Sequence, residues 1–241
     1  METIERRIQG ASRYGLALQL LAIIVLSATL FPALTPRQVV GSGTLTKLLF
    51  LGRMGLLLTI ATIFLRLRGL EWTDLGLRRP RLSRMIFSVV GGLFVSAALV
   101  AIVQQVVRRL GAPAADYSMF EPLKGNLTEY LYWALPVTLG SAALGEELVF
   151  RGFVRDALQR LLGSQDASTT SVAVALQAAL FGLVHLYQGW SGVATAGTIG
   201  LVLGSVWLAS GRNLWAGIVT HALLDLTSMT VIFFEGVPMA R

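Results

Sequence analysis

The sequence contains no cysteine and only two histidines among its 241 residues. Without cysteine, the chain can form no disulfide, no thiolate nucleophile and no cysteine-ligated metal site. Charged residues are also scarce, at 14% of the chain, against about 25% in ordinary soluble domains. Hydrophobic residues make up 54% of the chain, which is more apolar surface than a soluble domain of this length can bury. These shortages exclude an ordinary soluble fold and indicate an integral membrane protein.

Long runs without charge are the main structural signal in the chain. Residues 14–36 and 85–107 are each 23 residues long and contain no charged side chain. A helix of about 20 apolar residues crosses a bilayer, whereas membrane strands would alternate apolar and polar residues. We therefore predict an all-α polytopic transmembrane helix bundle of about seven spans (roughly six to eight), which forms a single integral membrane domain over residues 1–241. The other spans are expected over residues 48–65, from residue 127 into the segment 144–153, twice within residues 167–211, and over residues 213–234.

Residues 167–211 contain no Asp, Glu, Lys or Arg over 45 residues. As one helix they would extend ~68 Å, about twice the thickness of a bilayer core. The chain must therefore reverse direction, and we expect the reversal at residues 187–192. Small residues on the two resulting helices would let them approach closely; they are Gly182, Gly197, Gly200 and Gly204.

The arginines lie between the apolar runs, as topology signals do. With the N-terminus inside, the cytoplasmic segments hold 13 Lys and Arg residues and the outer segments hold 6. This bias predicts a cytoplasmic N-terminus and a position in the plasma (inner) membrane. The formal charge of +7 is thereby explained without a nucleic-acid partner.

Arg53 is the exception, because it stands inside the expected second span. Its place in the first turns of that helix predicts that the side chain reaches the nearer interface with its charged head. The alternative is that Arg53 pairs with a carboxylate inside the membrane.

Two adjacent carboxylates, Glu146 and Glu147, end an apolar run, and Arg151 follows them. Charged groups at such positions are costly and persist mainly where they are buried in the protein and used. Glu147 and Arg151 are four residues apart and share a helix face, which predicts an ion pair. Glu146 points about 100° away from Glu147 on a regular helix. Glu146 is therefore free to activate water as a general base.

Both histidines follow the glutamate pair and lie in apolar runs. His185 is four residues after Phe181, and His221 is four residues before Asp225. A lone histidine in an apolar helix is more often a hydrogen-bonded core residue, but a carboxylate one turn away can orient an imidazole or hold it protonated. Together with Glu146, the two histidines supply the base, the proton carrier and the positive donor that peptide hydrolysis needs.

These motifs together resemble a known family. Their order, Glu146-Glu147-x-x-x-Arg151, then Phe181-x-x-x-His185, then His221-x-x-x-Asp225, is similar to that of the CPBP family. This family includes the type II CAAX prenyl endopeptidases and the bacterial bacteriocin-processing or immunity (Abi-type) proteins. The resemblance covers about residues 127–230, which would form the catalytic core.

The resemblance implies an intramembrane endopeptidase that hydrolyses a peptide bond in a membrane protein or a lipidated peptide. Glu146 would activate the water together with His185. Glu147, Arg151 and Phe181 would support the first motif, while His221 and Asp225 would stabilise the oxyanion. The resemblance leaves two chemistries open: Glu146, His185 and His221 could ligate zinc with water as the fourth ligand, or they could perform acid–base catalysis without a metal.

Asp225 departs from the prenyl endopeptidases, which carry asparagine at this position. An ionised carboxylate would repel an oxyanion, so we expect Asp225 to pair with His221 and keep the imidazole cationic. The three residues are also expected at different depths in the membrane. His185 is expected at the far end of its span, whereas Glu146 and His221 are expected near the cytoplasmic side. These residues can meet only if residues 164–175 lie along the interface or if the helices tilt strongly. The alternative to an enzyme is a non-catalytic immunity or scaffold protein, or a small ion- or proton-coupled transporter.

Overall fold

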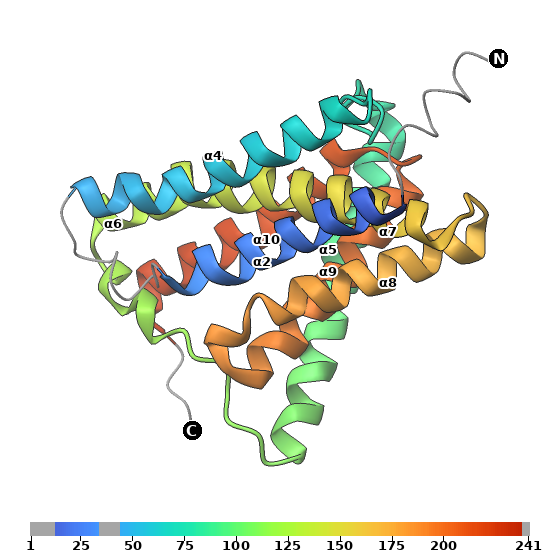
Figure 1. Ribbon diagram of the computed structural model, residues 1–241. Helices are drawn as coiled ribbons and strands as arrows, with labels where there is room; N and C mark the ends of the chain where they lie inside the picture. The colour runs from blue at the N-terminus through green and yellow to red at the C-terminus, as the bar shows by residue number, and fades with distance from the viewer. Residues whose placement is uncertain (1–12, 34–43, 238–241) are drawn as a thin grey trace, which may run out of the picture.

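The structure, a computed structural model, describes residues 13–33 and 44–237. Every regular element in these ranges is helical (Figure 1). The α-helices are α2 (Arg13–Ala33), α4 (Thr44–Leu67), α5 (Leu82–Arg109), α6 (Leu127–Tyr132), α7 (Arg155–Leu162), α8 (Ala167–Leu183), α9 (Gly189–Ala209) and α10 (Leu214–Glu235). The others are the 3₁₀ helices η1 (Ser118–Leu123) and η3 (Leu186–Gln188) and the π-helix η2 (Trp133–Val154).

Four helical segments of the described ranges are long and apolar enough to cross a membrane: α4, α5, residues 186–209 and α10. Shorter apolar stretches lie in α2 and α8, at residues 13–29 and 167–183. The predicted all-α membrane bundle is thus confirmed. Residues 34–36, the end of the predicted first span, lie outside the described residues. The last predicted span, which polar residues could have divided, is one continuous helix, α10.

The predicted fourth span belongs to a helical path that continues from α6 through η2 into α7. Its central part is a π-helix of 22 residues, in which each N–H bonds five residues back. Such helices are rare and often mark functional sites. Because η2 packs against α4, α8 and α10, its inward-facing side chains are enclosed by helices from both halves of the chain.

Helices α8 and α9 form the predicted hairpin. The reversal lies between Leu183 and Gly189, and Gly189 has a φ of +80°. A Cβ atom on Gly182 would lie 2.7 Å from the carbonyl oxygen of Val193, so close packing of these helices requires glycine there. With its 17 residues, α8 extends ~26 Å, which is less than a bilayer core of about 30 Å.

Helix α5 is buried against the bundle only as far as Ser96. Its buried residues are Ser88, Val89, Gly92 and Ser96. A Cβ atom on Gly92 would lie 2.5 Å from a methyl group of Val206 on α9, so α5 and α9 pack closely at this point. The C-terminal part of α5 projects away from the other helices (Figure 1), and no residue after Ser96 is buried.

Candidate active site

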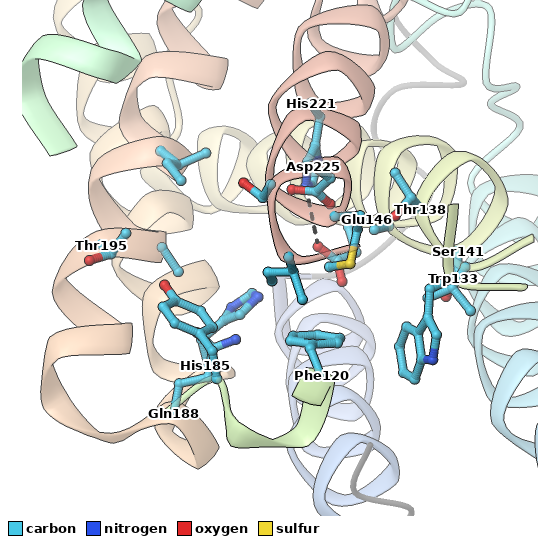
Figure 2. A pocket seen from close by; sticks show the side chains of 18 of the residues that line it. Phe120, Trp133, Thr138, Ser141, Glu146, His185, Gln188, Thr195, His221 and Asp225 are labelled. Carbon is cyan, nitrogen blue, oxygen red and sulfur yellow. Dashed lines mark ion pairs between the residues drawn. The ribbon is translucent and has the colours of Figure 1, made fainter. Parts of the chain in front are cut away.

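A cavity of about 460 Å³ lies between η2, α9, α10 and the chain reversal after α8. Its lining includes Glu146, His185, His221 and Asp225. Figure 2 shows Glu146, His221 and Asp225 close together, with His185 on another side beside Gln188. The structure therefore brings all four predicted polar residues to one cavity, although they come from three separate parts of the chain.

The end of α8 places His185 at the cavity. This helix ends at Leu183, and His185 stands in the irregular segment before η3. Irregular backbone at membrane depth is tolerated where it lines a cavity, as residues 185–188 do here. His185 therefore lines the same cavity as Glu146 from the segment that follows α8.

Glu147 lies behind the cavity wall, with its side chain fully buried. Its Oε1 is 2.9 Å from Nη1 of Arg151, which is the predicted ion pair. The same oxygen is 3.1 Å from Nδ1 of His221 on α10. A Cβ atom on Gly217 would lie 2.5 Å from Oε2 of Glu147. Helix α10 therefore presents a glycine where the carboxylate approaches, and Glu147 joins the first motif to the third.

His221 has carboxylates at both ring nitrogens. Nδ1 faces Glu147, while Nε2 is 3.5 Å from Oδ2 of Asp225 and 4.0 Å from Oε2 of Glu146. The pairing with Asp225 agrees with the prediction, and the contact with Glu147 adds a second partner. Since an imidazole can satisfy two acceptors only when both nitrogens carry protons, the arrangement favours an imidazolium at this position.

His185 is held differently. Its Nδ1 is 2.8 Å from the carbonyl oxygen of Phe181. As this oxygen accepts only, Nδ1 carries the proton in the neutral imidazole and Nε2 keeps a lone pair. The ring of Phe181 packs 4.8 Å from the ring of His185 and 6.1 Å from that of His221, between centroids. The Arg151 guanidinium also packs on Phe181, 4.1 Å from the centroid of its ring. Phe181 thus links the first, second and third motifs by packing.

Arg53 overturns the prediction that its head reaches the interface. The side chain is buried, lines the cavity and lies over the ring of Phe50, 3.6 Å from the centroid. A guanidinium on an aromatic face gains cation–π attraction, which is larger where water is excluded. The physical reason for the error is that α4 turns this position toward the bundle, where an internal cavity provides a polar environment.

Three residues that the sequence reasoning did not single out also line the cavity: Ser141, Tyr187 and Thr195. Tyr187 stands in the predicted chain reversal, and that position was its only signal. Serine and threonine occur widely in membrane helices, so their spacing gave no indication. Part of the cavity wall is aromatic: Phe50 and Phe120 each pack edge-on against Trp133.

The described ranges contain no group of three His, Asp or Glu side chains arranged to hold a metal ion. Of the three candidate zinc ligands, His221 directs Nδ1 to Glu147, and its Nε2 is 4.0 Å from Glu146. His185 lies on another side of the cavity (Figure 2). Glu146, His185 and His221 therefore do not fit a tetrahedral zinc site in this arrangement.

Helix α7 continues from η2 beyond the first motif, and its polar side chains Arg155, Asp156 and Gln159 are buried. Arg155 donates to the carbonyl oxygen of Arg151 and to Oε1 of Gln159, while Gln159 donates to Thr170 on α8. Burial lowers the pKa of Arg155 to about 10. These bonds attach the end of η2 to the start of α8, so the first and second motifs share one support.

Residues 128–227 match the family described as type II CAAX prenyl endopeptidase, Rce1-like. The match contains all three motifs and confirms the family that they predicted. No curated protein matches the chain. No solved structure matches it either.

Proposed function

From this membership of residues 128–227 in the Rce1-like type II CAAX prenyl endopeptidase family, we propose that the chain is an intramembrane endopeptidase with Glu146 as general base. Its substrate is a membrane protein segment or a lipidated peptide. The observation that carries the proposal is that Glu146, His185, His221 and Asp225 line one cavity. The volume of that cavity, about 460 Å³, is in the range of sites that enclose a small ligand.

In the proposed reaction, the peptide bond lies in the cavity between Glu146 and His185. Glu146 takes a proton from water, and the hydroxide attacks the carbonyl carbon. The lone pair on Nε2 of His185 accepts a hydrogen bond from the same water and aligns it. The carbonyl oxygen becomes an oxyanion, and the Nε2–H of the His221 imidazolium donates to it. Glu146 then returns its proton to the amide nitrogen as the C–N bond breaks, which releases an acid and an amine.

Asp225 and Glu147 serve this reaction through His221. Glu147 fixes the ring at Nδ1, and Asp225 lies beside Nε2. Both carboxylates favour the charged ring, which compensates for the repulsion between Asp225 and the oxyanion. The residues that touch the reacting atoms are thus Glu146, His185 and His221, while Glu147, Asp225, Arg151 and Phe181 position them.

The test is cleavage of an internally quenched, lipidated peptide by purified protein in proteoliposomes. We expect Glu146→Ala and His185→Ala each to reduce the rate by about 10²–10⁴-fold, the usual contribution of a positioned acid or base. Thr198→Ala is a suitable control, because Thr198 is not in the cavity lining and its hydroxyl bonds only within α9. Unchanged cleavage in both site variants would reject the assigned site.

We also propose that the protein lies in the plasma membrane with its N-terminus in the cytoplasm. The support is the excess of Lys and Arg in the segments on that side. Because the chain has no cysteine, single cysteines can report this orientation. A cysteine placed at Arg79 should react with a membrane-impermeant maleimide only after the cells are opened.

A further inference from the structure

The cavity is open on one side. Its aromatic wall is closed by the packing of Phe50, Phe120 and Trp133. On the other side it is lined by Val100 and Gln104 from α5 and by Thr227 and Ser228 from α10. Gln104, Thr227 and Ser228 are exposed, so this part of the lining is accessible from outside the bundle.

The packing of α5 explains the opening. An apolar cluster of Val89, Val202, Val206 and Ala216 joins its N-terminal half to α9 and α10. Beyond Ser96 no residue of α5 is buried, and the helix stands away from the bundle (Figure 1). The cavity extends between this part of α5 and helix α10, where residues from both helices line it.

The outer surface of α5 beside this opening is apolar. On the outer side of α5, Ile102 and Val106 are 57% and 49% exposed, which suits the hydrocarbon region of a bilayer. Both α5 and α10 are candidate membrane spans. The opening also leads to the reacting groups, because the Asp225 side chain is 33% exposed whereas the side chains of His221 and Glu146 are 6% and 9% exposed.

Resting on the proposed function, we infer that the substrate enters sideways from the bilayer, between the C-terminal half of α5 and α10. The occupant is an extended segment of a membrane-anchored polypeptide. Extended backbone within a bilayer leaves N–H and C=O groups without partners, at a cost of several kcal/mol each. The amide of Gln104 can donate and accept, and the hydroxyl oxygens of Thr227 and Ser228 can accept. These groups offer hydrogen bonds along the route to Glu146.

The absence of cysteine allows a direct test in the full chain. The variant Gln104→Cys/Ser228→Cys is treated with a bifunctional methanethiosulfonate reagent, which bridges α5 and α10 and is removed by reduction. Bridging should slow cleavage of the lipidated quenched peptide in proteoliposomes by at least about tenfold, as expected when an entry motion is blocked. Reduction should restore the rate, which shows that the protein remained folded.

The matched control is the same double variant treated with the small methyl reagent, which carries both adducts but no bridge. Its rate is the reference, and the bridged protein should cleave at least about tenfold more slowly than this control. A methyl-treated protein that is equally slow would show that the adducts, not the bridge, reduce the rate, and would overturn the proposal. A bridged protein that cleaves at the rate of the reduced protein would overturn the proposed entry route.

A second measurement separates this proposal from the proposed activity. In the Glu146→Gln background, benzophenone attached at Gln104→Cys should capture the lipidated peptide on illumination, and benzophenone attached at Ile102→Cys should not. Ile102 lies two residues away on the same helix and does not line the cavity. If even the wild-type protein cleaves nothing, the proposed activity fails while capture at Gln104 alone still supports the entry route. Equal capture at both positions, or capture at neither, would overturn it.

Discussion

The two neighbouring glutamates belong to two different regions of the site. Glu147 lies in a closed region, with no exposure and with Arg151, His221 and the backbone of Gly217 around it. Glu146 lies on the cavity side, where its Oε2 is 4.0 Å from Nε2 of His221. One residue of sequence thus separates a carboxylate enclosed by protein, with Oε1 bound to Arg151 and His221, from one that lines the cavity.

A fixed and a reactive carboxylate thus share one helix. His221 lies on the boundary, since Nδ1 belongs to the closed region and Nε2 to the open one. We expect changes in the closed region to affect folding first, and changes in the open region to affect catalysis alone.

The largest effect should follow Glu147→Ala. This variant leaves the fully buried Arg151 without its carboxylate, and breaking a buried pair typically costs about 3–5 kcal/mol. We expect a large fall in the stability of the purified protein against denaturant, together with loss of cleavage. Glu146→Gln should lose cleavage while keeping wild-type stability. Similar stabilities for these two variants would remove the distinction between the two regions.

Gly217→Ala should produce the next largest effect. The added methyl group would lie 2.5 Å from Oε2 of Glu147, and overpacking of this kind costs about 1–3 kcal/mol. The expected result is a lower thermal midpoint and a slower rate, since His221 moves with its helix. Gly140→Ala on η2 is the control, because a Cβ atom there meets nothing within 4 Å. A wild-type thermal midpoint for Gly217→Ala would contradict the close approach.

Asp225→Asn should leave the fold intact and change the pH profile. Asp225 lies 3.5 Å from Nε2 of His221, and its charge favours the protonated ring. Without that charge the ring loses its proton at lower pH, so the alkaline limb of the rate profile should move to lower pH. The measurement is cleavage rate against pH for both proteins, with stability recorded across the same range. A superimposable profile would show that Asp225 does not maintain the charge of His221.

The smallest effect is expected from metal removal. Because Glu146, His185 and His221 do not come together as ligands in the described structure, dialysis against a strong chelator should leave the rate unchanged. Inhibition that zinc specifically reverses would show that the open region rearranges around a metal.

The helices could be predicted because charge is confined to their ends or to the site. The charge-free residues 85–107 lie within α5, and the reversal expected at residues 187–192 overlaps η3 and the start of α9. The ion pair of Glu147 and Arg151 followed from a spacing of four residues, which remains on one face even in η2.

The rest depends on contacts that no local pattern contains. The bond between Glu147 and His221 joins residues 74 positions apart, and only the packing of α10 on η2 creates it. The inward direction of Arg53 depends on how α4 is rotated in the bundle. The π-helical hydrogen bonding of η2 also has no signal in its apolar sequence, since the hydrophobic pattern is compatible with an ordinary helix.

Helix α8 also has a consequence for the surrounding lipid. Its ~26 Å length falls short of a bilayer core of about 30 Å, and a bilayer adapts to such hydrophobic mismatch by thinning locally. Headgroups and water then reach deeper beside α8 than elsewhere around the protein. The membrane itself would supply the hydrolytic water near His185, so the activity should depend on acyl-chain length and be higher in thinner bilayers.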